Sequence, residues 1–153
     1  MRVGALIRKQ PALLHTEHDI SSGAVKHMDR NLFDRGLAKR RQVLGDAYVD
    51  RALESLDDFN RDFQRLATEY CWGEVWGDET LSPRERSILT LGMVAAIGKM
   101  GEFSNHVRGA ITNGLSPNDL RAVLTQVTIY CGIAVGADCF VLTKSILDEH
   151  VKK

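Results

Sequence analysis

The sequence predicts an all-α protein, a compact bundle of five or more helices, and three observations support that fold class. No segment shows the alternation of apolar and polar residues that is typical of a half-buried strand. Apolar residues instead recur every three or four positions along several segments, as on one face of a helix. Serine followed by proline also occurs at two places, each time with an acidic residue three positions after the serine, and this pattern starts helices.

The first clear helix is predicted from residue 50 to residue 70, where seven apolar side chains recur at helical spacing. Residues 71–77, CWGEVWG, hold two tryptophans and two glycines, and we expect a loop there. Further helices are expected at about 82–98, 102–113, 117–131 and 134–149. Glycines stand where the first three of these should end, namely Gly98 or Gly101, Gly114 and Gly132.

The helix at 82–98 is apolar on more than one face, because its stretch LTLGMVAAIG is nearly continuous. In a chain of 153 residues, such a helix is expected to be buried between other helices or in a subunit interface. A net charge of zero also favours self-association, so we expect a homo-oligomer.

Charge and cysteine content exclude several classes of function. Lysine plus arginine equals aspartate plus glutamate, at 20 each, so neither nucleic acid nor an anionic membrane is an expected partner. No run of about 18 apolar residues occurs, so no membrane span is expected. The three cysteines, Cys71, Cys131 and Cys139, form no C-x-x-C pair, which argues against a zinc knuckle or a thioredoxin-like centre. We expect them to be small core residues of a cytoplasmic protein.

Residues 1–32 are interpreted as an N-terminal extension, and 33–153 as one helical domain. The extension begins with a basic stretch whose short apolar run is interrupted at Arg8, so a secretory signal is not expected; a transit peptide is the less favoured alternative. His15 and His18 lie at a spacing of one helical turn, but no third metal ligand is anchored nearby. A solvated or partner-packed arm is therefore the favoured interpretation, and no metal site is expected.

Glu102 and His106 are the candidate chemical groups, because a spacing of four places them on one face of a helix. A neighbouring carboxylate favours the imidazolium and is expected to raise the histidine pKa. Such a pair can donate and accept protons near neutral pH. Taken alone, however, a pair at this spacing is more often a solvated contact on a helix surface.

Two arginines and two tryptophans strengthen the case for a site. Arg84 and Arg86 lie in the first turn of a helix, where a cation gains nothing from the helix dipole, so they are candidates for binding an anion. The alternative is a surface salt bridge. Trp72 and Trp76 are either packing anchors or walls of a pocket.

Five stretches of the chain, in order, resemble γ-carboxymuconolactone decarboxylase. They are DRGLAKRRQVLGDAYVDRALESLDDFNRDF (34–63), YCWGEVWG (70–77), LSPRERSILTLGMVAAIG (81–98), EFSNHVRGAITNGLS (102–116) and QVTIYCGIAVGADCF (126–140). The elements RR-x-VLG-x-x-x-VD, WG-x-x-W, H-x-R-x-A-x-x-NG and YCG are specific in combination, and the resemblance runs in order over about 34–149, more than three quarters of the chain.

The resemblance implies a helical fold of the alkylhydroperoxidase-D-like type, assembled as a homohexamer (or trimer) with sites near the subunit interfaces. It implies decarboxylation of γ-carboxymuconolactone, or a similar carboxylated butenolide, to 3-oxoadipate enol-lactone in aromatic catabolism by the β-ketoadipate pathway. No metal or organic cofactor is implied, because the unsaturated lactone accepts the electron pair itself.

The resemblance also suggests roles for individual residues. His106 is expected to donate the proton or to bind the oxyanion, and Glu102 to orient it. Arg84 or Arg86 is expected to hold a substrate carboxylate. The pocket is expected to be lined by Trp72, Trp76, Tyr130 and Cys131.

Thiol chemistry is excluded by register against the related thiol reductases, whose C-x-x-C-x-x-x-H motif is here Lys99-Met-Gly-Glu102-Phe-Ser-Asn-His106. Two positions depart from the decarboxylase pattern: Ala134 replaces a frequent proline, and Val141 a frequent histidine. These departures keep open an isomerase or a lactone-processing enzyme acting on another metabolite. A non-enzymatic oligomeric binding or stress protein is a further alternative.

Overall fold

The computed structural model describes residues 30–151, and every regular element in that range is helical. The all-α prediction is therefore confirmed for this part of the chain. The helices are α1 (Arg30–Leu44), α2 (Asp46–Glu54), α3 (Arg61–Leu66), the π-helix η1 (Ala67–Val75), α4 (Pro83–Ala96), α5 (Met100–Thr112), α6 (Pro117–Cys131) and α7 (Ile133–Val151). Residues 1–29 of the predicted extension, with their histidines, lie outside the described residues, and the predicted boundary at 32/33 falls inside α1.

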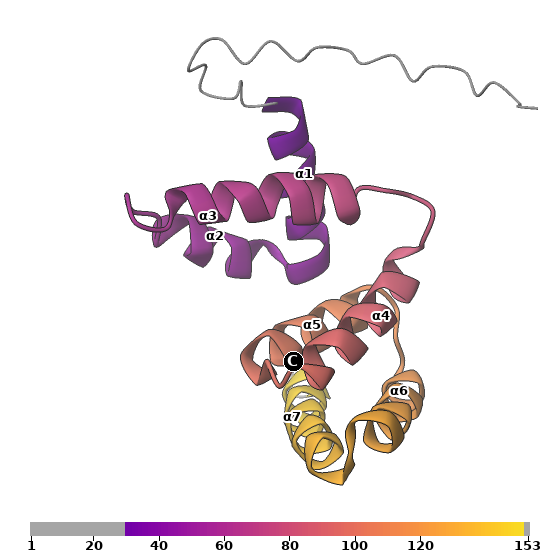
Figure 1. Ribbon diagram of the computed structural model, residues 1–153. Helices are drawn as coiled ribbons and strands as arrows, with labels where there is room; N and C mark the ends of the chain where they lie inside the picture. The colour runs from indigo at the N-terminus through magenta and orange to yellow at the C-terminus, as the bar shows by residue number, and fades with distance from the viewer. Residues whose placement is uncertain (1–29, 152–153) are drawn as a thin grey trace, which may run out of the picture.

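The helices form two groups, which Figure 1 shows one above the other. The first group contains α1, α2, α3 and η1, with α1 packed against η1. The second contains α4 to α7, in which α4 packs on α5 and α6 on α7. Residues 76–82 connect the two groups, and α5 also packs against α1. Helix α5 therefore lies at the boundary between the groups.

Each group has its own hydrophobic cluster. The larger cluster lies among α4 to α7 and includes the fully buried side chains of Leu91, Phe103 and Leu120. The smaller cluster joins Val43 of α1 to the two tryptophans of the chain, Trp72 and Trp76. Burial of such side chains removes apolar surface from water and stabilises the fold.

The predicted ends of α4, α5 and α6 are confirmed to within a few residues. Ser82 and Ser116 each form the reciprocal capping box with the acidic residue three positions later, followed by proline at the start of the helix. Gly98, Gly114 and Gly132 follow the three helices, each with φ between +68° and +99°, a conformation that glycine adopts without strain. These local signals fixed the boundaries.

The predicted single helix over residues 50–70 is wrong, because α2 ends at Glu54 and α3 begins only at Arg61. Polar side chains close a turn between them. The Asp57 carboxylate accepts hydrogen bonds from the backbone N–H groups of Phe59 and Asn60, and the Asn60 amide donates to the Ser55 carbonyl. Such side chains compete with the helical backbone for hydrogen bonds, so the chain turns.

The loop predicted for residues 71–77 is also wrong, since most of this segment continues η1. Close packing against α1 accompanies this wide helix. A Cβ on Gly36 would lie 2.0 Å from the Thr68 carbonyl oxygen, and a Cβ on Gly73 would lie 2.6 Å from the Leu32 carbonyl oxygen. Glycine at both positions therefore allows the two backbones to approach, and this approach places the tryptophans.

The corner between α1 and α2 explains the RR-x-VLG-x-x-x-VD motif. Gly45 turns the chain with φ at +83°, and the Arg41 guanidinium bridges Asp46 at 3.1 Å and Asp50 at 2.7 Å. Arg40 is buried and donates to the Gln64 side-chain oxygen at 3.0 Å. One arginine therefore joins α1 to α2, and the other joins α1 to α3.

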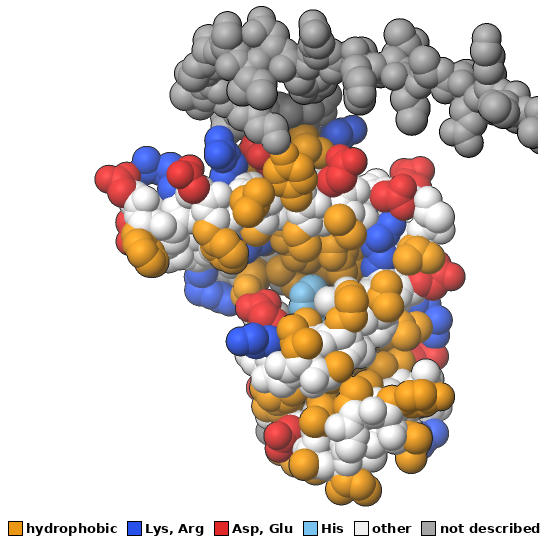
Figure 2. Space-filling view, viewed as in Figure 1, with side chains coloured by type: hydrophobic (Ala, Val, Ile, Leu, Met, Phe, Trp, Pro, Cys, Tyr) orange, Lys and Arg blue, Asp and Glu red, His pale blue; other side chains and the backbone are white. Residues whose placement is uncertain are grey.

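Helix α4 buries one apolar face and exposes another. Leu91 and Ala95 are fully buried, whereas Leu89, Met93 and Ile97 are exposed in the single chain. Figure 2 shows hydrophobic side chains spread over the surface of the second group. Within residues 30–151, no helix combines the length and apolar character needed to cross a membrane.

Candidate active site

His106 lies beside both tryptophans, on the face of α5 that meets the first group of helices. The centroid of its imidazole ring is 6.3 Å from that of Trp72 and 6.2 Å from that of Trp76, and the two indole centroids are 5.2 Å apart. The imidazole plane lies within 16° of each indole plane. Figure 2 shows histidine atoms at the junction of the two groups.

Burial controls the protonation of His106. Loss of hydration lowers its pKa below the ordinary value of 6.5, and the Glu102 carboxylate raises it by a smaller amount. The expected direction of the effect of Glu102 is therefore confirmed, but the expected net rise in pKa is wrong. In the free protein the imidazole is neutral at pH 7, with one nitrogen that can donate a hydrogen bond and one that can accept.

Glu102 lies one turn before His106 on α5, and its side chain is exposed. Its carboxylate and the imidazole form no ion pair within 4.0 Å, so they interact through space across a gap. Among the described residues, no hydrogen bond joins a partner to the His106 ring nitrogens. Neither group is therefore held by a hydrogen bond or an ion pair among the described residues.

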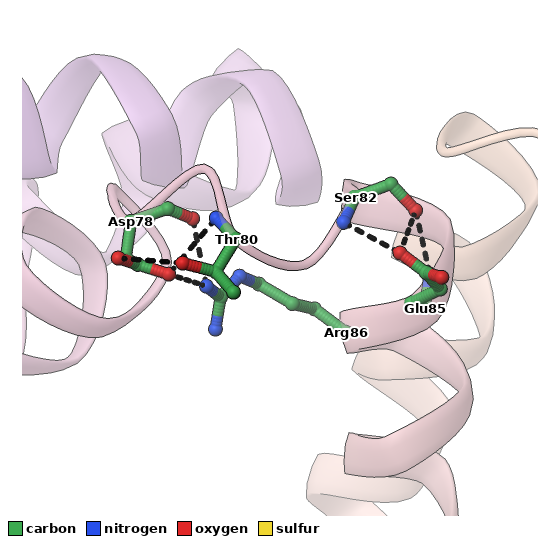
Figure 3. Close-up of polar contacts among 5 residues, drawn as sticks. All are labelled: Asp78, Thr80, Ser82, Glu85 and Arg86. Atoms are coloured by element: carbon green, nitrogen blue, oxygen red, sulfur yellow. Dashed lines mark hydrogen bonds and ion pairs between the residues drawn. The ribbon is translucent and has the colours of Figure 1, made fainter.

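The arginines predicted to bind a carboxylate are occupied by carboxylates of the chain. Arg84 pairs with Asp119 at 2.6 Å. Arg86 pairs with the Asp78 carboxylate and also donates to the Asp78 carbonyl oxygen, both at 2.7 Å. Figure 3 shows this contact, with Thr80 bonded to the same aspartate. These pairs support the salt-bridge alternative, and they join α4 to the first turn of α6 and to the segment that precedes α4.

Tyr130 and Cys131 lie apart from the tryptophan cluster. They line a groove of about 250 Å³ between α4 and α6, together with Ile88 and Val127. The predicted pocket residues therefore divide into two sets: the two tryptophans stand beside His106, and Tyr130 and Cys131 do not. Tyr130 is 82% exposed in the single chain.

A second cavity, of about 480 Å³ and with a more polar lining, opens between α2 and α5, and sequence reasoning missed it. Its lining includes Tyr48, Arg51, Asn105 and Arg108. The Asn105 amide donates to the Tyr48 hydroxyl at 3.3 Å. A signal was present, because the VLG-x-x-x-VD motif surrounds Tyr48, but the motif alone does not show which helix it faces.

The cysteines and acidic groups of the described chain form no metal or thiol centre. Cys139 is buried as expected, but Cys71 is exposed and Cys131 is half-buried, so the expectation that all three are core residues is wrong. Burial raises the pKa of the Cys139 thiol, which keeps it protonated. Within residues 30–151, no three His, Cys, Asp or Glu residues are grouped as metal ligands.

Comparison with known proteins gives concordant results. The profile of the carboxymuconolactone decarboxylase family matches residues 61–143, a range that includes the tryptophans, Glu102 and His106. Nitrosuccinic acid decarboxylase from Metarhizium robertsii is 36% identical over 126 residues, 82% of this chain and 88% of that protein. A 4-carboxymuconolactone decarboxylase from Acinetobacter baylyi is 35% identical over 105 residues, 69% of this chain and 78% of that protein.

A 4-carboxymuconolactone decarboxylase from Pseudomonas putida is 48% identical over 46 residues, 30% of this chain and 96% of that sequence. The helical architecture, the profile match and the first two relatives agree with one another. The chain therefore belongs to the carboxymuconolactone decarboxylase family and is a decarboxylase, a carboxy-lyase.

Proposed function

We propose that this decarboxylase acts on γ-carboxymuconolactone, or a similar carboxylated butenolide, to give 3-oxoadipate enol-lactone. The observation that carries the proposal is the neutral His106, with unpaired ring nitrogens, between an apolar indole wall and a carboxylate. The similarity to 4-carboxymuconolactone decarboxylase from Acinetobacter baylyi supports the choice of substrate.

The proposed reaction breaks the bond between the carboxylate carbon and the ring. CO₂ leaves, its bonding electron pair moves through the ring alkene, and the lactone carbonyl oxygen becomes an oxyanion. Trp72 and Trp76 are almost fully buried in the single chain, and the proposal places the reacting carboxylate against their apolar edge. Contact with an apolar group weakens the hydration of the carboxylate and favours the loss of CO₂. The substrate itself is the electron acceptor, so the protein has to bind the substrate, orient it and protonate it.

His106 is the proposed proton donor. An anionic substrate beside the ring raises the imidazole pKa, and Glu102 acts in the same direction. The imidazolium that forms on binding can stabilise the oxyanion and then protonate the ring carbon. These steps consume one proton for each CO₂ released, and solvent returns a proton to His106 through its unpaired ring nitrogen.

Nitrosuccinate is the alternative substrate, and the similarity to nitrosuccinic acid decarboxylase over 82% of this chain supports it. A nitro group can accept the electron pair of an adjacent carbanion, as the unsaturated lactone does in the first proposal. Both candidate substrates are small acids that carry more than one carboxylate, and both contain a group that can accept the electron pair left by CO₂. The isomerase and non-enzymatic alternatives have no comparable support.

Turnover assays with each compound test the proposal. The protein is incubated with γ-carboxymuconolactone or nitrosuccinate, and release of CO₂ and formation of product are followed. His106→Ala should lower kcat by roughly 100- to 10,000-fold on the true substrate. His150→Ala, which removes an exposed histidine near the end of α7, is the matched control and should retain activity. Near-normal kcat in His106→Ala would refute the assigned role.

Assembly as a homohexamer (or trimer) is part of the proposal. The exposed apolar side chains of α4, together with Ile133 and Val141 of α7, support it, because monomers rarely leave this much apolar surface in water. Light scattering of the purified chain tests the oligomeric state, and a monomer at micromolar concentration would contradict the proposal.

A further inference from the structure

We propose that the cavity between α2 and α5 is a carboxylate-binding site, in which Arg51, with Tyr48 and Asn105, holds the non-reacting carboxylate of a small dianionic substrate. The inference rests on the proposed decarboxylation, and it reassigns the anchoring role that the sequence had suggested for Arg84 and Arg86. Those two guanidinium groups are already paired with carboxylates of the chain.

Among the three arginines in and beside the cavity, the ion pairs of the described residues leave Arg51 without a carboxylate partner. Asp46 shares the Arg41 guanidinium with Asp50, and Arg108 is paired with Glu149 at 2.8 Å. Among residues 30–151, the Arg51 guanidinium has neither an ion pair nor a hydrogen bond. Arg51 is therefore the guanidinium group of the lining that remains available to one ligand carboxylate.

Two hydrogen-bonding side chains, Tyr48 and Asn105, line the same cavity as Arg51. The Tyr48 hydroxyl accepts a bond from the Asn105 amide, so its own proton remains available to a ligand. Both side chains are half-buried, and their contact fixes them across the cavity. A guanidinium group binds a carboxylate through two parallel hydrogen bonds, and a phenol donor adds a third.

The cavity is adjacent to the proposed reaction site because both share helix α5. Side chains of an α-helix are separated by about 100° per residue, so Asn105 and His106 lie on either side of Glu102 when the helix is viewed along its axis. Consecutive Cα atoms are about 3.8 Å apart. The cavity wall at Asn105 is thus one residue from His106 along α5, and the proposal places one carboxylate of a small acid against Arg51 and the other beside His106 and the indoles.

The test compares Arg51→Gln and Arg51→Lys with Arg121→Gln, an exposed arginine of α6 that has no ion pair among the described residues. Turnover of γ-carboxymuconolactone and of nitrosuccinate gives KM and kcat. Calorimetry with succinate, a dicarboxylate that does not react, measures binding without chemistry. We expect Arg51→Gln to raise KM roughly 10- to 100-fold with a small change in kcat, and to weaken succinate binding by a similar factor.

Arg51→Lys should recover part of the affinity, since it keeps the charge and loses the planar fork. Tyr48→Phe should weaken succinate binding by a smaller factor, and Arg121→Gln should change nothing. If neither acid is decarboxylated but Arg51→Gln still loses succinate binding, the carboxylate site stands and the proposed substrates are wrong. Failure of the unsubstituted chain to bind succinate would overturn the inference, as would an Arg51→Gln variant with unchanged KM and succinate affinity.

Discussion

Replacement of Gly36 by alanine should separate α1 from η1 and thereby disturb the tryptophans beside His106. The new Cβ would lie 2.0 Å from the Thr68 carbonyl oxygen and 2.8 Å from the Gly73 nitrogen, both of them backbone atoms. Ordinary van der Waals contact begins at 3.4 Å, so the Thr68 carbonyl has to retreat by about 1.4 Å. No side-chain rotation can relieve a clash with backbone.

The expected cost follows from two opposing effects. Overpacking of this kind destabilises a protein by up to ~3 kcal/mol, and the lower backbone entropy of alanine in a helix returns ~1 kcal/mol. The net loss is therefore about 2 kcal/mol of unfolding free energy. For a chain of 153 residues this corresponds to a fall in Tm of roughly 4–8 °C.

Thermal unfolding followed by circular dichroism measures the loss of stability. Intrinsic fluorescence reports the site itself, because the chain has two tryptophans and both belong to this cluster. Gly101→Ala is the matched control, since a Cβ on Gly101 of α5 meets nothing within 4 Å, and it should leave Tm unchanged or raised. An unchanged Tm and emission spectrum in Gly36→Ala would refute this account of the α1–η1 packing.

Three further outcomes are expected. Tryptophan fluorescence should fall as His106 becomes protonated, in a transition with its midpoint below pH 6.5. The variant His106→Gln should abolish this transition, and Glu102→Gln should move it to lower pH. A midpoint above pH 6.5 would contradict the argument that burial lowers the pKa of His106. His106 binds a proton more readily in the unfolded chain than in the folded chain. Its contribution to the free energy of unfolding is therefore complete above about pH 6.5 and is lost as the pH falls through the lower pKa of the folded state. In thermal scans, the Tm of His106→Gln should decrease less over this pH range than that of the unsubstituted chain. Leu124→Ala should lower the unfolding free energy by ~3 kcal/mol in urea titrations, because Leu124 is buried in the core of α4 to α7, and yet leave the fluorescence transition in place.

The second group of helices could be predicted in detail because its boundaries are local. A serine cap with its acidic partner, or a glycine of positive φ, determines a helix end from a few consecutive residues. The break after α2 depends instead on Asp57 and Asn60, whose turn hydrogen bonds outweigh a helical apolar pattern. The wide helix η1 depends on contact with α1, which no local pattern contains.

The candidate site was predicted only in part, because some of its contacts are local in sequence and others depend on how the helices pack. Glu102 and His106 share a helix, so their spacing was sufficient to place them on one face. The partners of Arg84 and Arg86 are set by how separate segments pack, and the cavity at Arg51 requires α2 to face α5. The pKa of His106 depends on burial beside two rings that are distant in sequence.

The two sides of helix α5 differ in how substitutions beside them affect the protein. One side carries Phe103 and Val107 into the main core, where changes of volume are costly. The opposite side meets α2, a short helix that packs chiefly on α1 and is joined to it by exposed Arg41 ion pairs. Substitutions at exposed positions of α2 that line the cavity, such as Ala47, can therefore reshape its wall without changing a core side chain, whereas Val49 of the same helix is fully buried. Under the proposed carboxylate site, changes on this one short helix would alter which acids the chain binds.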